Sequence, residues 1–217
     1  MAVDAASLGL ESGEATPDDF EQALQAAEDA APADLARAVG TMVTEARSLM
    51  AEAGADEGEE GPPPVPGEAF FAASVDVGDY LAANCGFETL DVTAKNYEFE
   101  NIPETVPAVT TVINFANTGT EFHEIALFQL AEGEERSVEE LLALPDGELE
   151  SLVTEKAFVF TPPDAQTYAT AELDPGRYVG ICFVPVGATP EALETGQALD
   201  EADAHFLHGM VAEFTVT

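Results

Sequence analysis

The sequence predicts a mainly β protein, a β-sandwich preceded by an N-terminal α-helical region. From Thr89 onward, short runs of β-branched and aromatic residues are separated by turn signals, which is typical of strands. In the first third of the chain, apolar residues recur instead at the three- and four-residue spacing of amphipathic helices. About seven short strands at this spacing predict a sandwich of two packed sheets.

Residues 1–54 predict a helical hairpin. The segment Thr16-Pro17-Asp18-Asp19 favours a helix start, because it combines a hydroxyl cap, a proline in the first turn and two acids near the positive end of the helix dipole. A second helix is expected after Pro32. Each helix carries one apolar stripe, consisting of Phe20, Ala23, Leu24 and Ala27 in the first and of Leu35, Val39, Met42, Val43, Ala46 and Leu49 in the second. The alternative interpretation is an amphipathic helix that binds a partner.

Residues 55–68 are rich in acid, glycine and proline, a composition that neither packs a core nor holds a helix. We therefore expect an exposed linker there. Residues 69–88 predict a connecting helix with Phe71, Val75 and Leu81 roughly on one face. We interpret Cys85, near the end of this helix, as a small buried residue that packs between the two parts of the chain. A disulfide bond between Cys85 and Cys182 is the alternative.

Residues 89–217 contain the predicted sandwich. The expected strands are Val92 to Phe99, Thr110 to Phe115, His123 to Leu130, Phe158 to Phe160, Tyr168 to Leu173, Tyr178 to Val184 and Val211 to Thr217. Two short surface helices are expected over Val138 to Leu144 and Glu148 to Val153. The segment Asp174-Pro175-Gly176-Arg177 predicts a tight turn between two strands.

The charge excludes two classes of partner. The chain has 43 acidic and 6 basic residues, a formal net charge of −37, and a surface this negative repels nucleic acid and anionic lipid. High-salt adaptation or solubility is the favoured explanation, because the acids are spread along the whole chain; electrostatic steering toward a basic partner is the alternative. No apolar run approaches the length of a membrane span, and Met1 to Glu14 lacks the features of a signal peptide.

Three segments place metal-binding side chains beside predicted strands. One histidine follows a turn, a cysteine comes at the end of an apolar strand, and a histidine and a methionine precede the last strand; in order these are His123, Cys182, His205 and Met210. A thiolate and two imidazoles fit copper in both oxidation states, and a thioether adds a weak axial contact. The four residues therefore predict one mononuclear copper site. The plainer alternative is that all four are ordinary core residues.

These segments resemble the cupredoxin family of plastocyanin-like and amicyanin-like blue copper proteins. The family pattern is a histidine after an Asn-containing turn, then Gly-x-Tyr-x-x-x-Cys, and then His-x4-Met before the last strand. The residues that match it are Asn117, His123, Gly176, Tyr178, Cys182, His205 and Met210. The resemblance covers about Thr89 to Thr217 and looks closest to secreted bacterial cupredoxins that have an N-terminal helical region.

Several further side chains belong to this hypothesis. We predict that Phe183, Phe206 and Leu207 form an apolar shell that keeps water off the metal. The chain departs from the family pattern in its long Cys-to-His loop, residues 183–204, and in the presence of a second histidine, His208. His208 is the alternative to His205 as a ligand, and the spacing to Met210 favours His205.

The resemblance implies a Greek-key β-sandwich with one type 1 copper ion and single-electron transfer without chemistry on a substrate, so we expect no enzyme. It also implies a monomer that works outside the cytoplasm, in the periplasm or at the cell surface, with its leader not present in this chain. The expected partner is a redox protein with a basic patch, not a small-molecule substrate. The alternatives are a metal-free interaction module of the same fold and a copper storage or delivery protein.

Overall fold

The computed structural model describes residues 16–55, 65–195, 199 and 201–217. Three helices precede the sheets: α2 (Pro17–Ala30), α3 (Ala36–Ala55) and α4 (Glu68–Asn84). The strands are β1 (Glu88–Lys95), β2 (Glu98–Glu100), β3 (Thr105–Val106), β4 (Thr110–Asn117), β5 (His123–Leu130), β6 (Val153–Thr161), β7 (Gln166–Glu172), β8 (Gly176–Ile181) and β9 (Val211–Val216). Between them lie the short helices α5 (Val138–Leu142), α6 (Asp146–Glu150) and α7 (Pro190–Glu194) and the 3₁₀ turn η1 (His205–His208).

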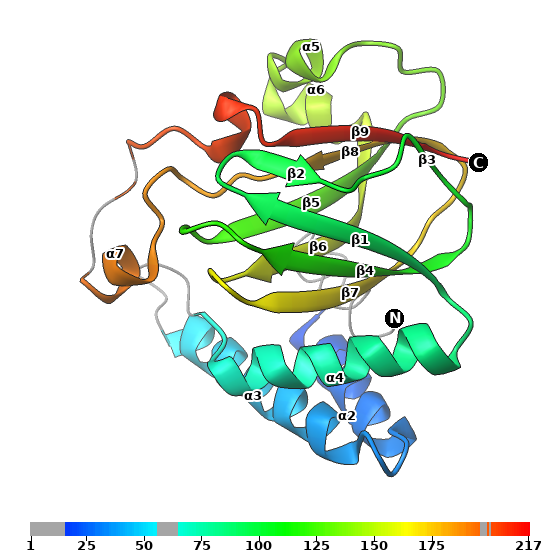
Figure 1. The fold of residues 1–217 in the computed structure, drawn as a ribbon, viewed down its shortest axis with the longest axis vertical. Helices are drawn as coiled ribbons and strands as arrows, with labels where there is room; N and C mark the ends of the chain where they lie inside the picture. The colour runs from blue at the N-terminus through cyan, green and yellow to red at the C-terminus, as the bar shows by residue number, and fades with distance from the viewer. Residues whose placement is uncertain (1–15, 56–64, 196–198, 200) are drawn as a thin grey trace.

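The strands form two mixed sheets that pack face to face (Figure 1). One sheet has the order β2-β1-β4-β7, with β1 parallel to β4, and the other has the order β3-β9-β8-β5-β6, with β3 parallel to β9. Apolar side chains from alternate positions of both sheets fill the space between them, as in the pattern of β1, where Leu90, Val92 and Ala94 are buried. This arrangement is the cupredoxin-like sandwich that the sequence predicts.

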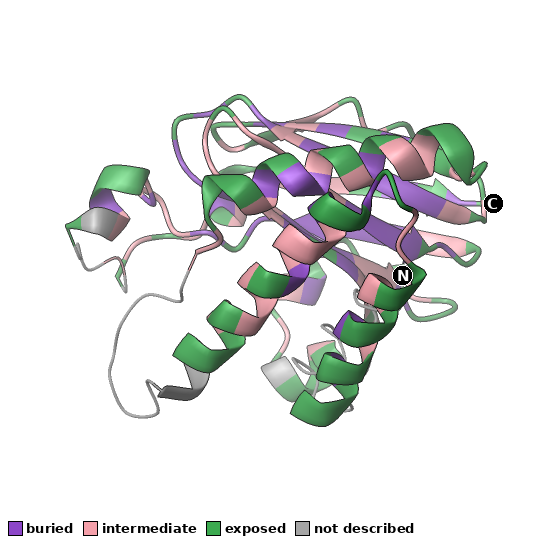
Figure 2. Cartoon of the chain, turned by 90° about the horizontal axis from the view of Figure 1, so that it is seen from below, coloured by how far each residue is buried: buried purple, intermediate pink, exposed green. Residues whose placement is uncertain are grey.

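The N-terminal helices pack outside this sandwich. Helix α4 lies against β7 and β4, with α3 and α2 beyond it (Figure 1). Thr16 and Asp19 form a capping box at the start of α2, as their positions in the sequence predict. Phe20 and Leu24 of α2 then pack on Val43 of α3, so the two apolar stripes face each other. Figure 2 shows that burial is concentrated in the strands and on the inner face of α4, whereas the outer faces of the helices are exposed.

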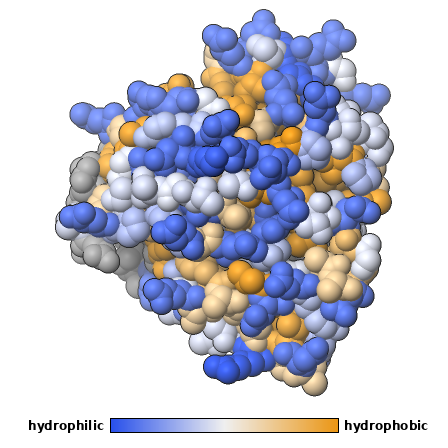
Figure 3. Space-filling model, in the orientation of Figure 1, coloured by the Kyte–Doolittle hydropathy of each residue, from blue (hydrophilic) through white to orange (hydrophobic). Residues whose placement is uncertain are grey.

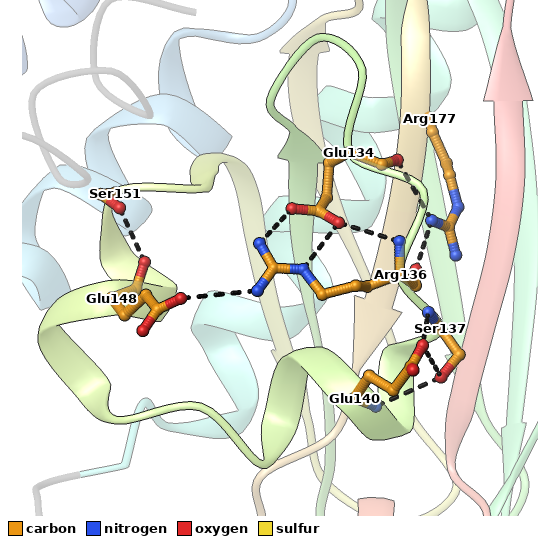
Figure 4. Close-up of polar contacts among 7 residues, drawn as sticks. All are labelled: Glu134, Arg136, Ser137, Glu140, Glu148, Ser151 and Arg177. Carbon is orange, nitrogen blue, oxygen red and sulfur yellow. Dashed lines mark hydrogen bonds and ion pairs between the residues drawn. The ribbon is translucent and has the colours of Figure 1, made fainter.

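A helical insertion between β5 and β6 covers the second sheet. Val138 and Leu141 of α5 pack on strand residues of β5 and β8. The Arg136 guanidinium donates hydrogen bonds to the Glu134 carboxylate and pairs with Glu148, and the Arg177 guanidinium donates to the backbone carbonyl of Arg136 (Figure 4). In a chain with only 6 basic residues, two arginines are therefore used to hold this insertion against the sheet.

The structure differs from the sequence-based expectations at several elements. The first predicted strand is two strands, because the chain turns at Asn96-Tyr97 and Tyr97 has a left-handed φ of 65°. Strand β3, helix α7 and the turn η1 were not expected, and the second surface helix ends at Glu150, before β6 begins. Cys85 is exposed, so its interpretation as a buried residue between the two parts is wrong: it caps α4 just before Gly86, which adopts a left-handed φ of 66°. Both cysteines are free thiols, which rules out a bridge between them.

Two expectations concern residues outside the described ranges. Most of the predicted linker over residues 55–68 and the segment Met1 to Glu14 lie there. Among the described residues, no helix combines the length and the apolar character that crossing a bilayer requires.

Close contact between α4 and β7 depends on a glycine. A Cβ atom at Gly78 would lie 2.0 Å from Cγ of the Tyr168 ring, so the helix approaches the strand only because residue 78 has no side chain. Ser74, one turn earlier, supports the same contact, because its hydroxyl accepts a hydrogen bond from the Tyr168 backbone N–H.

We expect Gly78→Ala to lower the free energy of unfolding by about 1–3 kcal/mol, because the added methyl group must displace the Tyr168 ring or the helix. The measurement is urea unfolding followed by circular dichroism. Gly40→Ala in α3 is the matched control: no atom lies within 4 Å of its new Cβ, so it should stabilise the helix by up to about 1 kcal/mol. Equal effects of the two substitutions would contradict the proposed close packing.

Candidate metal centre

His123 is placed by a tightly bonded turn before β5. The Asn117 side chain braces this turn: its Nδ2 donates to the carbonyls of Glu121 (2.8 Å) and Thr161 (3.0 Å), and its Oδ1 accepts from the Gly119 backbone N–H (2.8 Å). His123 then pairs with Thr161 of β6 as the first residue of β5, and it is fully buried. Asn117, matched above to the family pattern, therefore fixes the backbone that carries the histidine.

Cys182, His205 and Met210 are held together by their own backbones. Cys182 directly follows β8, and its N–H donates to the Met210 carbonyl (3.2 Å). The Met210 N–H in turn donates to the His205 carbonyl (3.2 Å), across a turn in which Gly209 has a left-handed φ of 106°. All three side chains have 0% exposure. Their relative positions are thus set by main-chain hydrogen bonds rather than by side-chain packing alone.

The long Cys-to-His loop returns to the site through a paired stem. Its two ends run side by side: the Val186 N–H donates to the Asp203 carbonyl (2.8 Å), and the His205 N–H donates to the Val184 carbonyl (2.9 Å). Pro185 and Ala204 form an isolated β-bridge between these bonds. Because these hydrogen bonds join the two ends of the loop directly, the position of His205 does not depend on the length of chain between them.

Two imidazoles and a thiol converge in a buried space at this end of the sandwich. His123 Nδ1 lies 3.1 Å from His205 Nδ1, and Cys182 Sγ lies 3.4 Å from the same His205 atom. Metal–nitrogen and metal–sulfur bonds of about 2.0–2.3 Å at tetrahedral to trigonal angles separate such donors by roughly 3.3–3.8 Å. The separation of Cys182 from His205 lies within this range, and that of His123 from His205 is slightly shorter. Among the described residues these three form the only cluster of three or more His, Cys, Asp or Glu side chains with a metal-binding geometry.

The donor set fits copper. Two imidazole nitrogens and a thiolate with a thioether nearby match a type 1 mononuclear copper site, and Met210 is buried in the same core cluster as Cys182. His123 Nδ1 faces this donor cluster, whereas His123 Nε2 points toward Gly119 and is buried without a hydrogen-bond partner among the described residues.

Burial sets the protonation of these groups. Desolvation, with a smaller contribution from His205, lowers the pKa of His123 to about 4, so its ring is neutral at pH 7 and can act as a ligand. Burial also lowers the pKa of His205, against an opposing effect of its hydrogen bond to Glu121. The pKa of the Cys182 thiol is raised by burial to about 12, so a metal ion must displace a proton to bind it as thiolate.

The other side chains assigned to this site have different positions. His208 is exposed and pairs with Asp203 (3.4 Å), outside the donor cluster. Phe183 is 42% exposed and Leu207 is 62% exposed, so these two do not form the predicted dry shell. Phe206 is half-buried and packs edge-on against Phe183. Phe122 and Val184 are instead buried in the same core cluster as Cys182 and Met210.

Two residues of the site were missed in the sequence. Glu121 is 9% exposed; its carboxylate lies 3.1 Å from His205 Nε2, and the Tyr97 hydroxyl donates to it (3.1 Å). The Tyr97 ring packs edge-on against the His205 ring, with centroids 5.0 Å apart. Burial raises the pKa of Glu121, but hydrogen bonds from Gly187, His205 and Tyr97 outweigh this effect, and the net pKa is lowered.

We expect Gly119→Ala to weaken copper binding about tenfold, because a Cβ atom at this position would lie 2.7 Å from His123 Nε2 and must displace the ring. The measurement is a competition titration against a chelator of known copper affinity. Gly147→Ala is the control, because no atom lies within 4 Å of the added Cβ. Unchanged affinity of Gly119→Ala would show that the ring does not need this space.

Solved structures to which this chain is similar include two auracyanins and a multicopper oxidase. No protein-family model matches the chain, and no curated protein matches its sequence. Reduced auracyanin from Roseiflexus castenholzii is 20% identical (TM-score 0.38), and the match covers 59% of this chain and 96% of that one. Auracyanin A, a "blue" copper protein from Chloroflexus aurantiacus, is 18% identical (TM-score 0.35) over 61% of this chain and 100% of its own. The multicopper oxidase McoA from Aquifex aeolicus is 14% identical (TM-score 0.32), over 61% of this chain and 30% of its own.

These identities and TM-scores are low, so the fold and the metal site are identified from the structure of this chain. Two mixed sheets pack as a sandwich, the N-terminal helices lie outside it, and the donor side chains gather at one end. The chain therefore has a cupredoxin-like fold with the geometry of a mononuclear copper site of the His₂CysMet type.

Proposed function

We propose that this protein is a type 1 copper protein that binds one copper ion through His123, Cys182, His205 and Met210 and carries single electrons. The observation that supports this most strongly is the convergence of two imidazole nitrogens and one thiol in a fully buried space, with donor separations of 3.1 and 3.4 Å. Copper supplies reversible one-electron chemistry when bound in such a site.

The chain's own contribution is rigidity. His123 is fixed by β5 and the braced Asn117 turn, and the other three residues by the hydrogen bonds that join their backbones. Because these supports belong to strands and their immediate ends, the donors keep their places when one electron arrives or leaves. A site that barely rearranges transfers electrons with little reorganisation, which is what a carrier requires.

We favour a carrier over an enzyme because of the histidine count. Oxidases with several copper ions need further histidines, and this chain has three, of which His208 lies outside the cluster.

We favour electron transfer over copper delivery because all four proposed ligands have 0% exposure, whereas a delivery protein must release its cargo. The free thiols remove the disulfide that would have favoured a metal-free module.

The surface beside the site supports docking of a redox protein. Phe183, the residue after Cys182, and Leu207 expose apolar side chains there, and the chain carries a net charge of −37. Figure 3 shows hydrophobic side chains at the surface near α5 and α6, among the hydrophilic side chains that cover most of this face. A partner with a basic patch around an apolar contact complements this surface, and we place the exchange outside the cytoplasm, where proteins of this type act.

Adding one equivalent of Cu(II) to the purified protein should give an intense thiolate-to-copper charge-transfer band in the visible spectrum. Cys182→Ser should abolish the band, because it removes the sulfur ligand. Cys85→Ser should retain it, because this thiol is exposed and lies outside the donor cluster. A colourless wild-type protein with Cys182 free would overturn the proposed function.

The two C-terminal histidines provide a second test. His205→Ala should bind copper at least about tenfold more weakly, because it removes a ligand, and should lose the charge-transfer band. His208→Ala should keep both the band and the affinity, because His208 is exposed and contacts Asp203. Loss of the band in His208→Ala alone would reverse the ligand assignment.

A further inference from the structure

The outer nitrogen of His205 is bound to a carboxylate inside the protein. Glu121 Oε2 lies 3.1 Å from His205 Nε2 and also accepts the Gly187 backbone N–H at 2.6 Å, while Oε1 accepts the Tyr97 hydroxyl at 3.1 Å. His205 itself has 0% exposure. Glu121 therefore stands where solvent would otherwise meet the edge of the imidazole, and three separate segments of the chain hold it there.

This contact fixes the tautomer of His205. A carboxylate oxygen accepts hydrogen bonds, so the favourable arrangement puts the proton of His205 on Nε2. Nδ1 then carries a lone pair, and it is this atom that faces His123 Nδ1 and Cys182 Sγ. With the opposite tautomer, the lone pair of Nε2 would face the negative charge of Glu121 inside the protein, which is unfavourable. Glu121 thus turns the donor atom of His205 toward the metal.

The same carboxylate acts on the charge of the site without being a ligand. Glu121 is not part of the cluster of donor atoms, and its negative charge reaches the metal through the imidazole. A carboxylate that accepts the N–H of a ligating histidine makes that histidine a stronger donor. A stronger donor and a nearby negative charge both favour Cu(II) over Cu(I).

On this basis, and assuming the copper site proposed above, we propose that Glu121 is a positioning residue that orients His205 and holds the reduction potential of the site down. Tyr97 moderates the effect, because its hydroxyl hydrogen bond withdraws part of the carboxylate charge. Glu121 exchanges no electrons itself; it determines how readily the site accepts one.

The first experiment compares Glu121→Gln with the wild type at pH 7. Glutamine keeps the shape and can still accept the His205 N–H, but it removes the charge. We expect the equilibrium constant for reduction to rise about tenfold, which is about 59 mV for a one-electron couple, measured by redox titration of the charge-transfer band. Copper(II) affinity, measured by chelator competition, should fall while copper(I) affinity changes less.

Two control variants separate the effect of the Glu121 charge from the effects of losing any surface charge or of loosening the site. Glu172→Gln removes one exposed carboxylate from the end of β7, where Glu172 pairs with Thr110 at the start of β4, and should change the constant by less than about twofold. Tyr97→Phe removes the hydroxyl donor but keeps the ring against His205, and should not raise the constant. If Glu121 were only structural, Glu121→Gln and Tyr97→Phe would loosen the site in the same way and shift the constant in the same direction.

A measurement on the metal-free wild type tests the orientation independently of folding of the variants. Nitrogen-15 NMR of the histidine rings should find the His205 proton on Nε2; a proton on Nδ1 would overturn the proposal. Equal reduction constants for Glu121→Gln and Glu172→Gln, in proteins that both show the charge-transfer band, would overturn it while leaving the copper function intact. A wild type with no such band would overturn both.

Discussion

The structure depends on bringing a thiol and two imidazoles into contact where water cannot reach them. His123 and His205 are separated by 82 positions in the chain, yet their Nδ1 atoms lie 3.1 Å apart. Both ring nitrogens of His205 have polar contacts, whereas His123 Nε2 is buried with no hydrogen-bond partner among the described residues. Burying an unpartnered polar atom costs free energy of folding. The large apolar core of the sandwich, which includes Cys182 and Met210, offsets that cost.

The two layers outside the sandwich have different supports. Helix α4 is close to the first sheet because Gly78 admits the Tyr168 ring, whereas the α5–α6 insertion is held to the second sheet by apolar contacts and two arginines. Neither layer supplies a donor atom to the cluster. The donor side chains therefore lie at the ends of strands, and the helices serve to cover the outer faces of the sheets.

Much of the fold could be predicted from local patterns, and the failures have physical causes. Strand β5 begins and ends at the expected residues, because its apolar run follows a clear turn. The break at Tyr97 was missed, because an aromatic residue favours a strand and nothing local indicates a left-handed φ. The four proposed ligands could be recognised by residue type and order, but Glu121 could not: among 43 acidic residues, one carboxylate becomes meaningful only through a contact with His205, 84 positions away.

The paired stem of the Cys-to-His loop makes the geometry of the site independent of the length of that loop. The His205 N–H donates to the Val184 carbonyl and the Val186 N–H to the Asp203 carbonyl, and the contacts of Gly187 and Ala188 with Glu121 and Phe122 lie just beyond these bonds. Among the described residues, α7 forms none of these bonds, although Leu193 packs against the core. The loop between the two sides of the stem can therefore vary in length without moving the backbone that positions His205.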